Sequence, residues 1–147
     1  MPSQSAQAEH DARPLAAIWP VHVRAFARFL PILRAQFGGD LDAMLVMLLV
    51  SVGTEHPDWP SALLESGPPR GRARPTNAAS IAEASGIPRE TVRRKLNALH
   101  ARGWIERDAA GTWRPARSAA DDLRPATQAT LDYLQTVIGA AQNGTAD

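Results

Sequence analysis

Apolar residues recur at steps of three and four between residues 19 and 37, the spacing of one face of an amphipathic helix. The stripe consists of Val23, Phe26, Leu30, Leu33 and Phe37. Pro31 interrupts it, so we expect a kink or a break near residues 29–30. Residues 1–13 show no such periodicity, and ordered structure is expected to start near Pro14.

A second predicted helix spans Leu41–Val52 and is apolar on every side. Gly38 and Gly39 end the preceding helix, and Asp40 is a suitable N-cap for this one. An apolar helix must be covered on several sides. Two arrangements provide that cover: a second subunit, or a central position within the helix's own chain.

Residues 54–75 contain five prolines and the basic residues Arg70, Arg72 and Arg74, which indicates a long loop. The arginines have two interpretations: contacts with a DNA backbone or minor groove, or charges on a solvated linker. The titratable residues Glu55, His56 and Asp58 in this loop are interpreted as solvated charges.

The next segment reads NAASIAEASGIPRETVRRKLNALHARGWIERDAAGTWRPA from Asn77, and its spacing predicts a helix-turn-helix. Ala82 allows two helices to cross closely, and Gly86 accepts the left-handed conformation of the turn. The apolar residues Ile81, Ile87, Val92, Leu96 and Leu99 are expected to pack between the helices. Pro88 is suited to start the second helix.

A β-hairpin is predicted directly after the second helix, which Gly103 ends. Residues 104–107 form the first expected strand, 108–111 the turn and 112–114 the return strand, before Pro115. Such a hairpin covers the apolar side of the two helices as a wing.

The stretch SIAEASGIPRETVRRKLNALHARGWIER resembles the winged helix-turn-helix of bacterial transcription regulators and is similar to the pattern shared by the MarR and GntR families. The resemblance covers about residues 77–115. The order of elements looks most like that of MarR-type regulators, which implies a homodimer built by the terminal helices. The Pro-rich insertion and the short wing depart from that pattern.

Charge is concentrated in the same part of the chain. Residues 70–117 hold eleven basic and four acidic residues, a balance of +7, and the remainder carries −6. Either the segment is a nucleic-acid face or it is a basic surface without a partner.

Side chains on the outer face of the second helix are of the types that read base edges in the major groove. The candidate base-reading residues are Arg89, Glu90, Arg93, Arg94 and Asn97. The candidate phosphate and wing contacts are Thr76, Ser80, Thr91, Arg107, Thr112 and Arg114. An i,i+4 ion pair on a solvated face is the alternative for Glu90 and Arg94.

A last helix is predicted up to about residue 141, with an apolar stripe of Thr127, Leu131, Leu134 and Ile138. That stripe can pair with its twofold mate or pack on the first helix, and we favour the mate. The predicted organisation is a tail (1–13), N-terminal dimerisation and core helices (14–53), a Pro-rich basic loop (54–75), a winged helix-turn-helix (76–117), a C-terminal dimerisation helix (118–141) and a tail (142–147).

Catalytic and metal-binding patterns are missing from the sequence. It has no Cys, its four His are scattered, and no phosphate loop, nucleophile elbow or dinucleotide fingerprint is present, so no enzyme, metal or cofactor is expected. The longest apolar run, residues 43–50, is too short to span a bilayer. No secretion signal is recognised, so we expect a cytoplasmic location without a membrane partner.

The sequence therefore predicts a mostly α winged helix-turn-helix protein that acts as a homodimeric transcriptional regulator, more specifically a repressor bound to an inverted repeat in double-stranded DNA. The alternative is a protein–protein adaptor that uses the same fold without reading DNA. A small-molecule effector is a further option, with Trp19, Phe26 and Trp59 as candidate lining residues.

Overall fold

The computed structural model describes residues 4–52 and 76–144, and the predicted loop 54–75 lies outside the described residues. The chain forms two compact units. One contains residues 36–124, and the other combines the N-terminal segment up to Ala35 with the C-terminal segment from Pro125.

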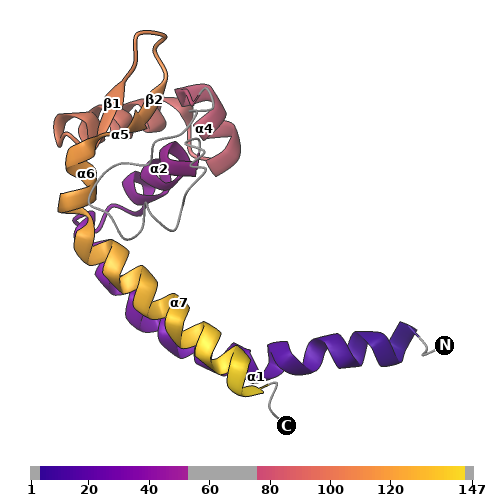
Figure 1. Cartoon of the computed structure of the whole chain (residues 1–147). Helices are drawn as coiled ribbons and strands as arrows, with labels where there is room; N and C mark the ends of the chain where they lie inside the picture. The colour runs from indigo at the N-terminus through magenta and orange to yellow at the C-terminus, as the bar shows by residue number, and fades with distance from the viewer. Residues whose placement is uncertain (1–3, 53–75, 145–147) are drawn as a thin grey trace. The chain divides into compact units, whose positions relative to one another are not determined.

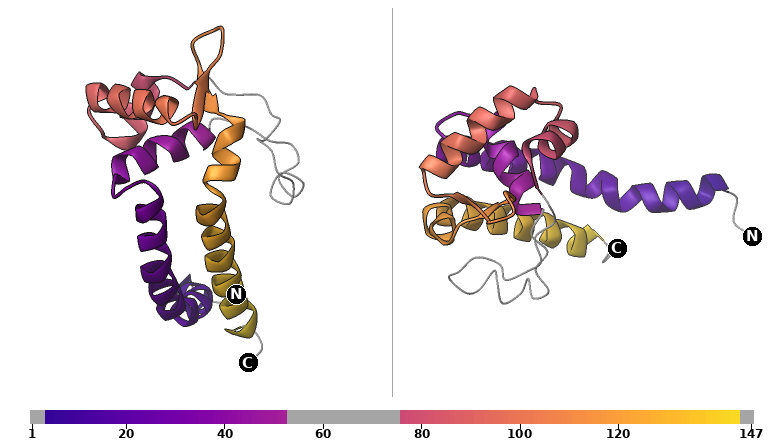
Figure 2. Two further views of the ribbon diagram at one scale, coloured as in Figure 1. Left: turned by 90° about the vertical axis from the view of Figure 1, so that its left-hand side faces the viewer. Right: turned by 90° about the horizontal axis from the view of Figure 1, so that it is seen from above.

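The unit of residues 36–124 is the winged helix-turn-helix that the sequence predicts (Figure 1). Its elements are α2 (Leu41–Val52), α4 (Ala78–Ser85), α5 (Arg89–Ala101), β1 (Ile105–Arg107), β2 (Trp113–Pro115) and α6 (Arg117–Asp122). β1 and β2 form a two-stranded antiparallel sheet. Figure 2 shows this hairpin projecting away from the packed helices. α6 was not predicted as an element separate from the C-terminal helix of 118–141, because its six residues are too few to show a helical period.

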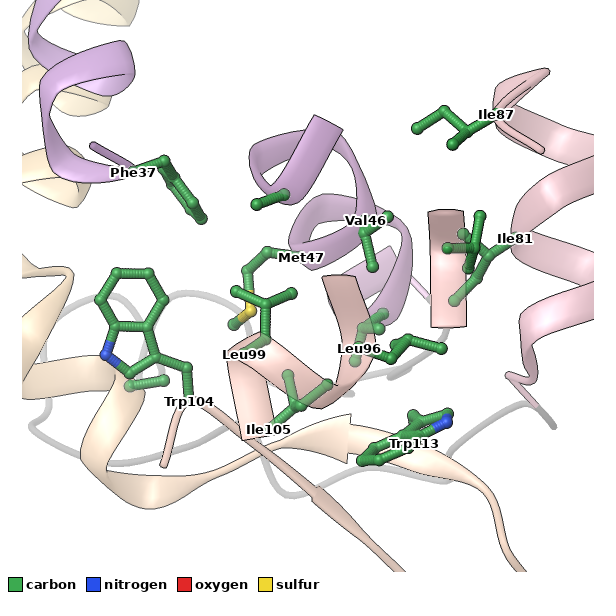
Figure 3. Close-up of a cluster of buried hydrophobic side chains, with 14 residues drawn as sticks. Phe37, Val46, Met47, Ile81, Ile87, Leu96, Leu99, Trp104, Ile105 and Trp113 are labelled. Carbon is green, nitrogen blue, oxygen red and sulfur yellow. The ribbon is translucent and has the colours of Figure 1, made fainter. Parts of the chain in front are cut away.

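The core of this unit lies between α2, α4, α5 and the hairpin (Figure 3). α5 buries Val92, Leu96 and Leu99, as predicted. They pack with Ile81 and Ile87 from the helix-turn-helix, with Val46, Met47 and Val50 from α2, and with Trp104, Ile105 and Trp113 from the hairpin. The predicted packing of the two helices beneath a wing is confirmed, and α2 covers their remaining side.

α2 has the predicted bounds, and the described residues leave one of its faces exposed. Its buried residues are Ala43, Val46, Met47 and Val50. Leu41 and Leu48 are 45% and 49% exposed among the described residues. The prediction of an all-round apolar helix therefore holds for its composition, and the described part of the chain leaves one face of it open.

Asp40 joins the start of α2 to α5. One carboxylate oxygen accepts a hydrogen bond from the Ala43 N–H at 2.9 Å, which confirms the predicted N-cap. The other oxygen lies 2.6 Å from Lys95 Nζ on α5. Burial raises the pKa of Asp40, but the hydrogen bonds from Lys95 and Ala43 outweigh it and hold that pKa below the usual value.

The second unit is a helical hairpin of α1 (Gln4–Gln36) and α7 (Arg124–Gly144), and Figures 1 and 2 show α7 beside the C-terminal part of α1, whose N-terminal part bends away from it. Tyr133 of α7 packs among His22, Phe26 and Phe29 of α1, with ring centroids 5.2 to 6.0 Å apart. His22 Nδ1 and the Tyr133 hydroxyl are hydrogen bonded at 2.7 Å. These contacts tie the first and last helices together.

The predicted apolar stripes of these helices pack in the hairpin only in part, since Phe26 contacts Tyr133 but other members are exposed. On α1 the buried residue is Ala25, whereas Val23 is 47% exposed. On α7 the buried residue is Ala126, whereas Ile138 is 53% exposed. Members of both stripes are therefore left exposed on the described hairpin, and the printed contacts between the helices are the aromatic ones around Tyr133.

α1 differs from its prediction in two ways. It begins at Gln4, where the sequence indicated a tail to residue 13, because a helix needs no apolar stripe when its residues have good intrinsic propensity. It also continues past Pro31 to Gln36, so the alternative of a break is wrong. Pro31 and Ala27 are both exposed, and water can therefore bind the Ala27 carbonyl that Pro31 leaves without a hydrogen bond.

No single helix among residues 4–52 and 76–144 is long and apolar enough to cross a membrane. Segments 15–36 and 41–52 reach the required length and composition only when they are joined as a bent pair.

The Asp40 interactions predict how stability depends on pH. A carboxylate with a lowered pKa stabilises the fold above its unfolded pKa of about 3.9, and this contribution is lost as the pH falls through the folded pKa. Asp40→Asn keeps the cap and removes the charge. Denaturant unfolding should therefore show a deficit for Asp40→Asn at pH 7 that shrinks at pH 3, and an equal deficit at both values would contradict this assignment.

Substitutions of Gly86 and of Gly139 by Ala should change the stability of the protein in opposite directions. The Gly86 φ of +71° is the left-handed turn conformation, so Gly86→Ala should destabilise the protein by about 1 kcal/mol although no atom lies within 4 Å of the added Cβ. Gly139 also has open space at its Cβ but lies inside α7 without a positive φ, so Gly139→Ala should stabilise that helix by up to about 1 kcal/mol. Thermal unfolding of both variants measures the two effects.

Candidate nucleic-acid interface

The start of α4 is fixed by its own side chains. Asn77 Oδ1 accepts hydrogen bonds from the N–H groups of Ala79 and Ser80 at 2.9 and 3.0 Å. The Ser80 hydroxyl accepts from the Asn77 N–H and donates to the Asn77 carbonyl, which completes a capping box. Ser80, predicted as a phosphate contact, therefore has a structural role at this helix start.

Packing of α5 determines which of its side chains face solvent. Val92, Leu96 and Leu99 are buried, so the opposite face carries all five predicted base-reading residues, and all of them are exposed. Lys95 lies on the side towards α2 and is neutralised by Asp40. The basic charge of α5 that remains open to a partner therefore belongs to its arginines.

The wing positions two arginines in different ways. The register pairs Glu106 with Arg114, and their side chains form an ion pair at 2.8 Å. It also pairs Arg107 with Trp113, and the Arg107 guanidinium carbon lies 5.4 Å from the centroid of the Trp113 ring. Arg107 Nε donates to the Gly111 carbonyl at 3.0 Å.

A cleft of about 280 Å³ lies between α5, the start of α4 and the wing. We call it the cationic cleft, and its lining residues are Asn77, Ala78, Arg89, Arg93, Leu96, Asn97, Arg107, Gly111 and Trp113. It brings together three predicted base-reading residues of α5 and one predicted wing residue. No carboxylate is among its lining residues.

The remaining two base-reading candidates do not line this cleft. Arg94 donates to the Thr91 hydroxyl at 3.1 Å, on the edge of α5 away from the wing. Glu90 pairs with Arg93 at 3.2 Å and not with Arg94, so the predicted i,i+4 ion pair is replaced by an i,i+3 pair. Both side chains of that pair are more than 60% exposed, so it stabilises the helix only weakly.

Two further candidate phosphate contacts, Thr76 and Thr112, take part in interactions within the protein. Thr76 is only 6% exposed, and its carbonyl accepts a hydrogen bond from the Trp113 N–H at 3.1 Å. Its hydroxyl is therefore not on the surface that a phosphate reaches, and we remove Thr76 from the candidate contacts. Thr112 is half-buried in the wing turn, where its N–H donates to Asp108 Oδ1 at 2.8 Å.

Gly111 and Trp113 are site residues that the sequence pattern did not indicate. They touch Arg107 only because of the strand register, which opposes position 107 to position 113. A fixed hairpin register inferred from the turn residues 108–111 would have indicated this pairing. Among the described residues, no cluster of three or more His, Asp or Glu could hold a metal ion.

Comparison with known proteins gives one match. Residues 70–109 match the IclR helix-turn-helix domain, which covers α4, the turn, α5 and β1. No curated protein and no solved structure matches the chain. The match does not support the MarR-type resemblance, because IclR is a different family. It does support the coarser assignment, which the geometry shares: the chain carries the winged helix-turn-helix of a DNA-binding transcription regulator.

Proposed function

We propose that this chain is a sequence-specific, homodimeric transcriptional repressor that reads an inverted repeat with α5. The observation that carries the proposal is the exposed polar face of α5, which continues into the cationic cleft beside the wing. An exposed helix of this kind fits the major groove, where Arg pairs with guanine and Asn with adenine. Occupancy of a promoter by such a protein blocks transcription.

Arg89, Arg93 and Asn97 lie at steps of four along one edge of that face. Arg89 and Asn97 make no hydrogen bond or ion pair with any described residue, so their donors are available to a base or phosphate. Arg93 has only the exposed contact to Glu90. Little interaction energy within the protein opposes their transfer to DNA.

The helical hairpin supports the dimer. Its exposed apolar residues include Trp19, Val23 and Phe26 on α1 and Leu134 and Ile138 on α7. These residues include members of the stripes that the sequence predicts for dimerisation. Apolar surface of this extent favours a second subunit, and two subunits present two recognition helices to the half-sites of an inverted repeat.

A groove of about 430 Å³ on the hairpin is the place where an effector would bind. Phe29, Ile32 and Tyr133 contribute apolar surface to it, and Arg28 and Asp132 are at its polar positions. The predicted lining residues Trp19 and Phe26 are not part of this groove, and Trp59 lies outside the described residues. An effector and a cytoplasmic location remain predictions.

The rival function is a protein–protein adaptor, and substitutions on α5 distinguish the two. Arg94→Ala and Asn97→Ala each remove an exposed side chain and leave the buried face intact, so unfolding free energy should change by less than about 0.5 kcal/mol. Affinity for a selected DNA site should fall by about 1–3 kcal/mol, with relaxed discrimination at one base pair in each half-site. Fluorescence anisotropy with specific and nonspecific duplexes measures both effects.

Arg117→Ala is the matched control, because Arg117 is exposed and lies in α6, away from the cleft. It should retain base discrimination. If the α5 variants bind every duplex as the parent does, the adaptor is the better interpretation and DNA reading by α5 is refuted.

The dimer surface is tested by two variants of α1. Val23 and Ile32 are 47% and 48% exposed, but Val23 belongs to the apolar stripe and Ile32 lines the groove. Val23→Glu places a charge in the proposed interface and should shift the protein towards monomer, whereas Ile32→Glu should remain dimeric. Sedimentation velocity at micromolar concentration measures the mass, and a parent protein that is only a 15.8 kDa monomer would refute the dimer.

A further inference from the structure

The two arginines of the wing differ in how much of their charge is free. Arg114 is neutralised by Glu106 across the strand pair. Arg107 makes no ion pair with a described residue: its Nε is bound to the Gly111 carbonyl, and its guanidinium lies over Trp113. The hydrogen bond and the ring hold the guanidinium in place and leave both terminal nitrogens as free donors.

The free end of Arg107 belongs to the same cleft as Arg89 and Arg93 of α5. Glu90 forms an exposed ion pair with Arg93, and Asp108 accepts a hydrogen bond from the Thr112 N–H, but neither carboxylate lines the cleft. Arg89, Arg93 and Arg107 therefore line one hollow whose lining, among the described residues, includes no carboxylate. This cluster repels itself in the free protein and favours an anion in the cleft.

A phosphodiester is the anion that fits this arrangement. With α5 in the major groove, the edge of that groove is a sugar–phosphate strand, and the wing beside α5 meets that strand. Guanidinium groups bind phosphate oxygens through paired hydrogen bonds, and several of them can share one phosphate.

We propose that the cationic cleft clasps one backbone phosphate of each half-site, with Arg107 from the wing and Arg93 from α5 on the same phosphate. Gly111 and Trp113 are positioning residues for Arg107. This inference rests on the proposed DNA-binding function and assigns the wing a defined part in it. The shared phosphate fixes the depth and register of α5 in the groove, so base reading depends on a contact that itself carries no sequence information.

The salt dependence of DNA binding tests whether the two arginines share a phosphate. The number of counterions released on binding reflects the number of phosphates neutralised, and not the number of arginines that contact them. For a nonspecific duplex, the slope of log affinity against log salt is about −0.9 for each phosphate neutralised. The experiment compares Arg93→Ala, Arg107→Ala and the double variant by fluorescence anisotropy between about 0.05 and 0.2 M salt, a range chosen for measurable binding.

A shared phosphate predicts that the double variant loses about 0.9 units of slope per protomer, with less than that in each single variant. Over a tenfold change in salt this equals about an eightfold change in affinity. Separate phosphates predict losses of about 0.9 for each single variant and about 1.8 for the double variant. The second pattern, or no change in slope, would overturn the clasp while DNA binding itself persists.

Arg114→Ala is the control, since Arg114 is also a wing arginine but lies outside the cleft. Combined with Arg93→Ala, it should give additive changes. Arg107→Lys tests the positioning by Gly111 and Trp113: Lys keeps the charge but lacks the Nε donor and the planar group, so it should lose nearly as much slope as Arg107→Ala. Full rescue by Lys would overturn the positioning role. A parent protein that binds no duplex at all would refute the proposed function together with the clasp.

Discussion

Burial of one face of α5 is the constraint on which the rest of the site depends. Val92, Leu96 and Leu99 are almost completely buried among α2, α4 and the hairpin. Each large-to-small change in such a position costs about 2–5 kcal/mol, which is a substantial part of the stability of a domain of this size. The helix cannot rotate without exposing these residues. The polar residues on the opposite face are therefore presented to solvent by the core, and not by any contact of their own.

Ion pairs and hydrogen bonds within the protein determine which exposed basic side chains are available to a partner. The basic residues between positions 70 and 117 are not equivalent, since Lys95 is bound to Asp40, Arg114 to Glu106 and Arg94 to Thr91. Pairing inside the protein leaves Arg89 and Arg107 with free donors at the cationic cleft, and Arg93 with only an exposed ion pair. The balance of +7 between residues 70 and 117 includes the charge of Lys95, which Asp40 from outside that range neutralises. α5 and the wing bring together Arg89, Arg93 and Arg107, of which only Arg93 has an ion pair with a described residue.

Local patterns in the sequence predicted the winged helix-turn-helix well. The small residue at 82, the turn glycine at 86 and the buried positions of α5 follow from residue spacing within 77–99, and the structure confirms each of them. The sequence did not predict that Tyr133 joins α7 to α1, because more than a hundred residues separate it from His22. The cleft was missed for a related reason. Its composition depends on strand register, which places Trp113 and Gly111 against Arg107.

The central claim is that α5 reads base sequence in double-stranded DNA. Selection from a pool of duplexes with a randomised central region tests it most directly, because the pool assumes no particular binding site. The account predicts enrichment of an inverted repeat whose half-site centres are about 10 base pairs apart, one helical turn or a multiple of it. Repeated rounds that enrich no sequence above the starting pool, from a protein that is folded and binds the pool, would contradict sequence reading by this helix.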